Sequence, residues 1–163
     1  MKFRKTNPHS ARSSDSPGAR SLGVDAAAPW KVFECLVSSW WRDTTKLTEI
    51  LIAKEPPFGG VVTCMFLVDL GCLGPKQAFV SQFRTKALYE SEFRSAMIAR
   101  NPLVPTAYPL AAKIIRESVH YAESLGFGPS EAAQKTLSAL GSLQVADACE
   151  ETIPLGGPDG KPF

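Results

Sequence analysis

Apolar and polar residues alternate with a period of two in the first part of the chain, which predicts β-strands. The alternation is clearest over Trp30–Trp41, and the apolar stretch Leu47–Glu55 is a second strand candidate. A third run, Val61–Leu70, is apolar at both sets of alternate positions, so we expect a strand that is covered on both faces. The Pro- and Gly-rich stretch Pro56–Gly60 predicts the loop of a β-hairpin between the last two strands.

After Gly74 the spacing of apolar residues becomes that of helices. The clearest helix is predicted over Ala107–Phe127, where Ala111, Ile115 and Val119 recur at near-helical spacing. Shorter helices are predicted to begin at Pro75 and to cover Tyr89–Arg100 and Ser130–Gly141.

Strands that precede helices along the chain predict an α+β fold. We expect an antiparallel sheet of three to four strands, with the hairpin of residues 48–70 at its centre and three to four helices covering it. A last strand, ending at Ile153, is predicted within Leu143–Leu155. Residues 28–163 are expected to form a single domain, since a chain of 163 residues suits one domain.

Charge is unevenly distributed along the chain. Residues 1–27 contain five basic and two acidic residues, a net charge of +3, and few large apolar side chains. Such a segment cannot bury enough apolar surface to offset the entropy of ordering, so we predict a disordered basic tail. Its role stays open between an inert solvated tail and an arm that binds RNA or a protein. The rest of the chain has 13 basic and 14 acidic residues, which argues against an extended nucleic-acid-binding face.

The four cysteines stand far apart, without the spacing of metal ligands: Cys35, Cys64, Cys72 and Cys149. The start of the chain lacks the apolar stretch of a secretory signal, so we expect reduced thiols in the cytoplasm. No apolar run approaches the ~18 residues that a membrane span needs. We therefore predict a cytoplasmic protein without a metal site, a cofactor or a membrane association.

Three motifs resemble those of a family of uncharacterised bacterial proteins. They are "FLVDLGCLGPKQAF" at Phe66–Phe79, "VHYAESLGFGP" at Val119–Pro129 and "GKPF" at Gly160–Phe163. The resemblance covers roughly residues 30–163 and implies an architecture but no reaction. The chain departs from the family at Pro75 and Gln77, where an aliphatic residue and Asp or Asn are expected. It also ends where its relatives continue through another strand, so the resemblance implies a C-terminally truncated domain.

The exit of the third strand holds the candidate chemistry. Asp69 is a candidate metal ligand or general base, and the alternative is a structural acid that accepts hydrogen bonds from the next loop. Cys72 is a candidate nucleophile, because a helix N-terminus and nearby Lys76 would lower its pKa. His120 is the only candidate base for it in the folded part, and the alternative is a histidine on the helix surface.

Lys76 is also a candidate anion-binding residue. The stretch Gly71–Lys76 resembles a phosphate-binding loop in its glycines and lysine, but it is shorter and lacks the Ser or Thr that follows the lysine. The alternative is a tight turn whose glycines are required by the backbone.

Aromatic and basic residues gather at the end of the first strand. Trp41 and Arg42 are candidate binding residues, because an exposed indole beside cations can stack on bases. The interpretation that we favour is that the tryptophans close the core, and Trp41 is the best candidate among them for exposure.

Two functions follow from these candidates. The first is a non-enzymatic module that binds a protein or a nucleic acid. The second is a hydrolase or nuclease-like enzyme with a site around Asp69, Cys72 and Lys76. A second acid beside Asp69 in a concave site would favour the enzyme.

Overall fold

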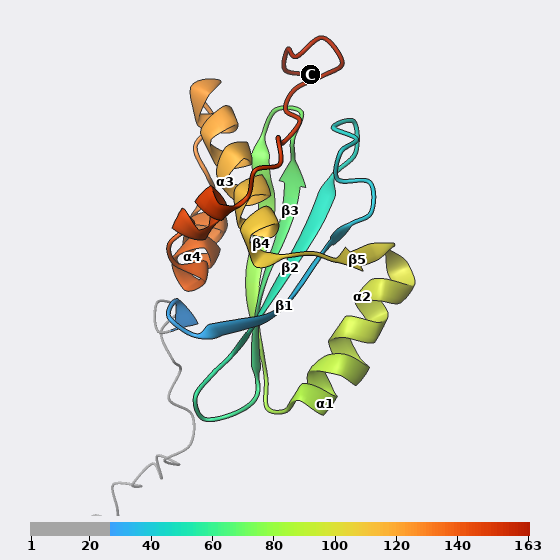
Figure 1. Cartoon of the computed structure of the whole chain (residues 1–163), viewed down its shortest axis with the longest axis vertical. Coiled ribbons are helices and arrows are strands. Elements are labelled where there is room, and N and C mark those ends of the chain that lie inside the picture. Colours follow the sequence, from blue (N-terminus) through green and yellow to red (C-terminus); the bar gives the residue numbers. More distant parts are fainter. Residues whose placement is uncertain (1–26) are drawn as a thin grey trace, which may run out of the picture.

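The computed structural model describes residues 27–163, so the predicted tail lies outside the described residues except for Ala27. Five antiparallel strands form one sheet in the order β4-β3-β2-β1-β5 (Figure 1). The strands are β1 Lys31–Ser38, β2 Thr48–Glu55, β3 Val61–Asp69, β4 Gly74–Phe83 and β5 Leu103–Pro105. The α+β prediction is confirmed, with one strand more than expected.

Helices cover the sheet on both faces (Figure 1). On one side, α1 Lys86–Leu88, a π-helical segment Tyr89–Arg94 and α2 Ser95–Arg100 follow one another without a break. On the other side lie α3 Tyr108–Ser124 and α4 Glu131–Leu140, followed by a 3₁₀ turn at Gln144–Ala148. We call the two sides of the sheet the α2 face and the α3–α4 face.

The hairpin predicted over residues 48–70 is confirmed. β2 and β3 pair in continuous register from Thr48 opposite Val68 to Lys54 opposite Val62. Both strands are flanked by other strands, and their side chains are buried on both faces, as the doubly apolar run Val61–Leu70 predicts.

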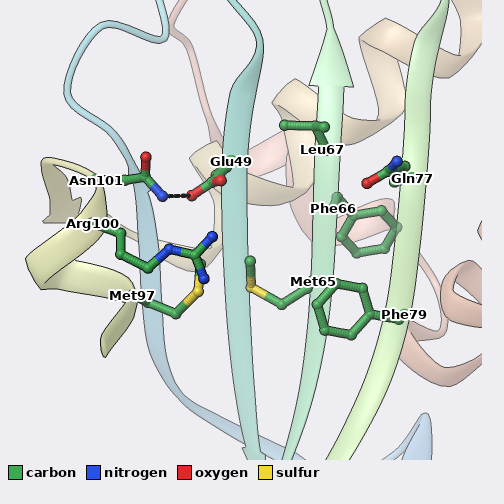
Figure 2. Close-up of a pocket in the computed structure, with 9 residues that line it drawn as sticks. All are labelled: Glu49, Met65, Phe66, Leu67, Gln77, Phe79, Met97, Arg100 and Asn101. Atoms are coloured by element: carbon green, nitrogen blue, oxygen red, sulfur yellow. Dashed lines mark hydrogen bonds between the residues drawn. The ribbon is translucent and has the colours of Figure 1, made fainter. Parts of the chain in front are cut away.

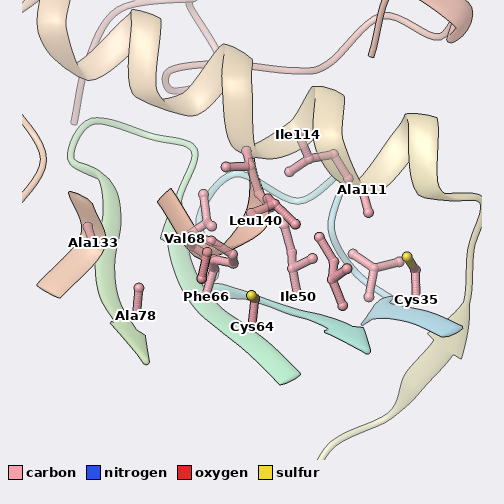
Figure 3. Packing of buried hydrophobic residues seen from close by; sticks show 14 of the residues in the cluster. Cys35, Ile50, Cys64, Phe66, Val68, Ala78, Ala111, Ile114, Ala133 and Leu140 are labelled. Atoms are coloured by element: carbon pink, nitrogen blue, oxygen red, sulfur yellow. The ribbon is translucent and has the colours of Figure 1, made fainter. Parts of the chain in front are cut away.

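The larger core lies on the α3–α4 face, between the sheet and the helices α3 and α4. Alternate residues of the strands, such as Ile50, Cys64 and Phe66, point toward Ile114 of α3 and Leu140 of α4 (Figure 3). The predicted starts of α3 and α4 are confirmed: proline occupies the first turn of α3, and the Ser130 hydroxyl accepts a hydrogen bond from the Ala133 amide at 3.2 Å.

The smaller core lies on the α2 face and centres on Tyr89. Its ring packs edge-on against Phe33 and near Phe83. The Tyr89 hydroxyl donates to Glu34 Oε1 at 2.5 Å, and Arg94 Nε donates to the same carboxylate at 2.8 Å. These bonds fasten the π-helical segment to β1.

A buried lysine joins the sheet to the α3–α4 layer. Lys54 of β2 is only 1% exposed, and its ammonium lies within hydrogen-bond distance of four backbone carbonyls. The acceptors are Ala27 O at 3.1 Å, Ala28 O at 2.9 Å, Ala139 O at 2.9 Å and Leu140 O at 2.7 Å. Two of these are carbonyls of the last turn of α4, whose negative dipole end favours a cation.

Two predicted elements are wrong. The segment after Gly74 is the edge strand β4 and not the start of a helix, because an edge strand tolerates Pro75. The strand predicted to end at Ile153 is absent from the described residues, which instead form the 3₁₀ turn and an extended segment there. Leu103–Pro105 already pairs with the outer edge of β1.

Candidate binding groove

The α1–α2 segment covers only part of its sheet face. Beside it lies an open groove of about 220 Å³, which we call the groove (Figure 2). Its apolar lining consists of Met65, Phe66 and Leu67 of β3, Phe79 of β4 and Met97 of α2. Its polar lining consists of Glu49, Gln77, Arg100 and Asn101. Phe79 is 49% exposed, so about half of a large apolar residue is left uncovered by the described part of the chain.

Strand alternation explains why these residues meet. In the antiparallel ladder Glu49 stands opposite Leu67, Leu67 opposite Gln77, and Met65 opposite Phe79. Directly opposite residues point to the same face, as do residues two apart on one strand, so these five strand positions share the floor of the groove. The helix α2 ends at Arg100, and its last turn supplies the opposite wall.

A carboxylate and a guanidinium lie at the α2 end of the groove. Asn101 Nδ2 donates to Glu49 Oε2 at 2.8 Å, and the Arg100 side chain extends toward β2 beside this pair (Figure 2). Burial raises the pKa of Glu49, and the positive charge of Arg100 and the Asn101 hydrogen bond oppose this shift only in part. Within residues 27–163, no other ionisable group acts appreciably on the Glu49 carboxyl.

The outer edge of β4 borders the groove. Among the described residues, β4 makes backbone hydrogen bonds with β3 alone. The register shifts between Leu67 and Val68, so Lys76 is the extra residue of a β-bulge, directly before Gln77 of the groove. The sequence-predicted Lys76 is exposed and lies on a strand, not on a helix, and it is not among the residues that line the groove.

Asp69 serves the turn that follows β3. Its Oδ1 accepts a hydrogen bond from the Gly71 amide at 2.9 Å, which is the structural alternative weighed from the sequence. It also lines a second hollow of about 230 Å³, together with Thr44, Thr45, Lys46, Leu47 and Phe163. No second acid stands among these lining residues.

Cys72 and His120 are not joined by a hydrogen bond in the described part of the chain. Cys72 is partly exposed in the turn between β3 and β4, whereas His120 is exposed on α3. The turn leads into the strand β4, so the helix N-terminus expected directly after Cys72 is not there. Gly74 has a φ of +64°, and an added Cβ would lie 2.8 Å from the Ser118 carbonyl oxygen, so the turn requires glycine.

Trp41 is buried, as the favoured interpretation predicts, so its candidacy as an exposed, base-stacking residue is wrong. Its side chain is 3% exposed and belongs to the larger core, because it closes one end of the sheet. Arg42 lies over the Trp41 ring at 4.2 Å and pairs with Glu151. Arg42 remains well exposed, but its guanidinium already has an aromatic and an acidic partner.

Sequence reasoning missed the groove. The missing step was β4: once Pro75–Phe83 is read as a strand, Gln77 and Phe79 fall on the same face as Met65 and Leu67.

Residues 27–163 contain no group of three or more His, Cys, Asp or Glu side chains placed to hold a metal ion. None of the helices in that range is long and apolar enough to cross a membrane. No family model, no curated protein and no solved structure matches the chain at a significant level. The family resemblance therefore stays a prediction.

Proposed function

We propose that the protein is a non-enzymatic interaction module that binds an extended segment of another protein in the groove between α2 and β4. The observation that carries this proposal is the half-exposed Phe79 ring, which lies across the groove from Met97 on a sheet face that helices cover elsewhere (Figure 2). Exposed apolar groups with a polar rim are typical of protein-binding surfaces. Cytoplasmic action is part of the proposal, since free thiols suit a reducing compartment.

The size of the groove supports a protein ligand over a small substrate. Sites for small molecules usually measure roughly 300–1,000 Å³ and enclose most of their ligand. The groove has about 220 Å³ and is open, which suits the anchoring of one large apolar side chain.

The chemistry of the lining points the same way. Glu49 and Arg100 are the charged residues in it, and no Ser, Cys, His or Lys accompanies them. A hydrolase needs a nucleophile or an activated water beside a base. The alternative enzyme around Asp69 gains no supporting observation, because no second acid lines the hollow beside it.

A peptide selection tests the proposal. A phage-displayed library of random linear peptides is selected on the full chain, and the enriched peptides are measured on Phe79→Asp and Met97→Gln. We expect binding to be lost on both variants, whose folding is checked by urea unfolding. The matched control is Phe127→Asp, because Phe127 is 47% exposed but lies in the loop between α3 and α4.

The control variant should bind like the wild type. If no peptide is enriched, or if the enriched peptides bind Phe79→Asp and Met97→Gln as well as the wild type, the proposed function is wrong.

A further inference from the structure

Arg100 is a cation without an anionic partner in the described part of the chain. Its guanidinium makes no hydrogen bond there and has no carboxylate oxygen within 4 Å, although it extends toward the groove (Figure 2). Three other arginines, Arg42, Arg94 and Arg116, each bind a carboxylate. Arg84 is also unpaired among these residues, but it does not line the groove.

Glu49 does not take the place of that partner. Its carboxylate is held by Asn101 and stays beyond ion-pair distance of Arg100. The Arg100 guanidinium, with its five N–H donors, therefore remains free for an acceptor that enters the groove.

Apolar groups lie directly beside this unpaired cation. Met97 is on the same helix turn as Arg100, and Met65 lies below it on β3, with Phe79 further across the groove (Figure 2). A ligand that satisfies both features carries a carboxylate next to a large apolar side chain. Carboxylate is the group that the planar guanidinium binds with two parallel hydrogen bonds.

We infer that the partner segment carries a carboxylate adjacent to its anchoring apolar side chain and that Arg100 receives this carboxylate. The inference rests on the proposed function and names its ligand. The carboxylate comes from an acidic side chain or from the C-terminus of the partner. A nucleic acid fits less well, because Glu49 would repel a chain of phosphates and the groove has a single cation among its lining residues.

The test uses the peptides obtained on the full chain. Each is synthesised with its acidic residue intact, with Asp or Glu replaced by the corresponding amide, and in a shortened form that ends after the apolar residue in either a free carboxylate or an amide. Affinities are measured by fluorescence anisotropy on the wild type, on Arg100→Gln and on the matched control Arg84→Gln. A short single-stranded RNA is measured in parallel.

We expect the amide peptides to bind the wild type about tenfold more weakly than the acidic ones. This difference should nearly vanish on Arg100→Gln and persist on Arg84→Gln. The shortened pair shows whether a terminal carboxylate serves as well as an acidic side chain.

Groove-dependent peptides that bind equally as acids and amides, or equally to Arg100→Gln, overturn this inference and leave the proposed function intact. RNA that displaces the peptides from the groove overturns it as well. A lack of any groove-dependent peptide overturns the proposed function itself.

Discussion

The ammonium of Lys54 has three protons and four carbonyl oxygens around it. The carbonyls belong to two separate stretches, Ala27–Ala28 and the last turn of α4, so one side chain of β2 holds both in place. A buried cation is usually costly, and here backbone dipoles replace the carboxylate that would normally compensate it.

Lys54→Met should lower the free energy of unfolding by about 3 kcal/mol, because it removes charged hydrogen bonds and leaves buried carbonyls without donors. Urea unfolding followed by circular dichroism measures the loss. The matched control is Lys31→Met on β1, an exposed lysine whose replacement should change stability by no more than about 0.5 kcal/mol. Equal stability of the two variants would show that the hydrogen bonds from Lys54 to the four carbonyls contribute little to the free energy of unfolding.

Glu49 should make peptide binding depend on pH. A ligand carboxylate beside Arg100 adds negative charge near Glu49, whose pKa burial already raises, so the pKa rises further in the complex. The complex then holds more protons than the free protein, and affinity should increase a few fold as the pH falls from 7 to about 5. The charged group that faces Glu49 is Arg100 of α2, whereas Ser38 of β1 and Gln77 of β4 are neutral.

The pH dependence is measured with an acidic peptide on the wild type and on Glu49→Gln. The variant should bind with nearly constant affinity over the same range. A wild-type affinity that stays flat, or a variant that follows the wild-type curve, would contradict the role given to Glu49.

Single residues are the hardest features to predict from sequence. The tryptophan pair looks alike in the chain, yet Trp41 is buried and Trp40 is partly exposed, because only their place at the sheet end separates them. Lys54 likewise reads as an ordinary strand lysine, since its four acceptors come from segments that only the tertiary fold brings together.

At the scale of the elements, the turn of the β2–β3 hairpin contains two neighbouring glycines, and only one of them also lacks room for a side chain. Gly59 and Gly60 have φ angles of +93° and +83°, so both favour glycine. An added Cβ at Gly59 meets nothing within 4 Å, whereas one at Gly60 collides with the Phe83 carbonyl oxygen at the end of β4.

Gly60→Ala should therefore destabilise the protein by about 3 kcal/mol, and Gly59→Ala by about 1 kcal/mol. The first change combines backbone strain with a collision, and the second involves strain alone. The two unfolding curves are compared under the same conditions. Similar losses for the two variants would mean that the end of β4 yields easily to the added methyl group.

Helices and strands with a strong local pattern are predictable from the sequence. Elements whose residues suit a helix and a strand equally well are not. The helices α3 and α4 follow from apolar spacing and end residues. β4 was open to a helical interpretation, because Pro75 suits a helix start as well as an edge strand. The edge of β1 is occupied by β5, and no strand forms at Ile153. β5 itself was not predicted, because a strand of three residues gives little signal in a sequence.

At the scale of the whole molecule, the two faces of the sheet differ in how firmly their helices are held. α1 and α2 contain no buried residue, and Tyr89 is the buried one in the π-helical segment between them. In α3 six residues are buried: Ala111, Ala112, Ile114, Ile115, Ser118 and Ala122. The helix α2, which forms one wall of the groove, thus buries less apolar surface against the sheet than α3 does.

Amides of Ser95–Arg100 should exchange with solvent faster than those in the middle of α3, because local opening of α2 costs less free energy. Hydrogen exchange followed by mass spectrometry measures this difference. A bound peptide should slow exchange in α2 most, because it contacts Met97 and Arg100. Equal protection of α2 and α3 in the free protein, or slowing confined to α3 on binding, would contradict this description.

The layered arrangement was predictable, whereas the groove was not. Covering a doubly apolar strand requires helices on both faces, and the sequence shows that strand. How far α2 extends over β4 depends on helix length and docking, which leave Phe79 open without any mark in the sequence.

The place of Ala27 has a practical consequence. It packs among residues of the α3–α4 face, tied through Lys54 to the end of α4, while the groove opens on the other side of the sheet. A tether attached at Ala27 therefore starts on the side away from the groove. A chain fixed to a sensor chip at this position would display the groove to the flowing solution.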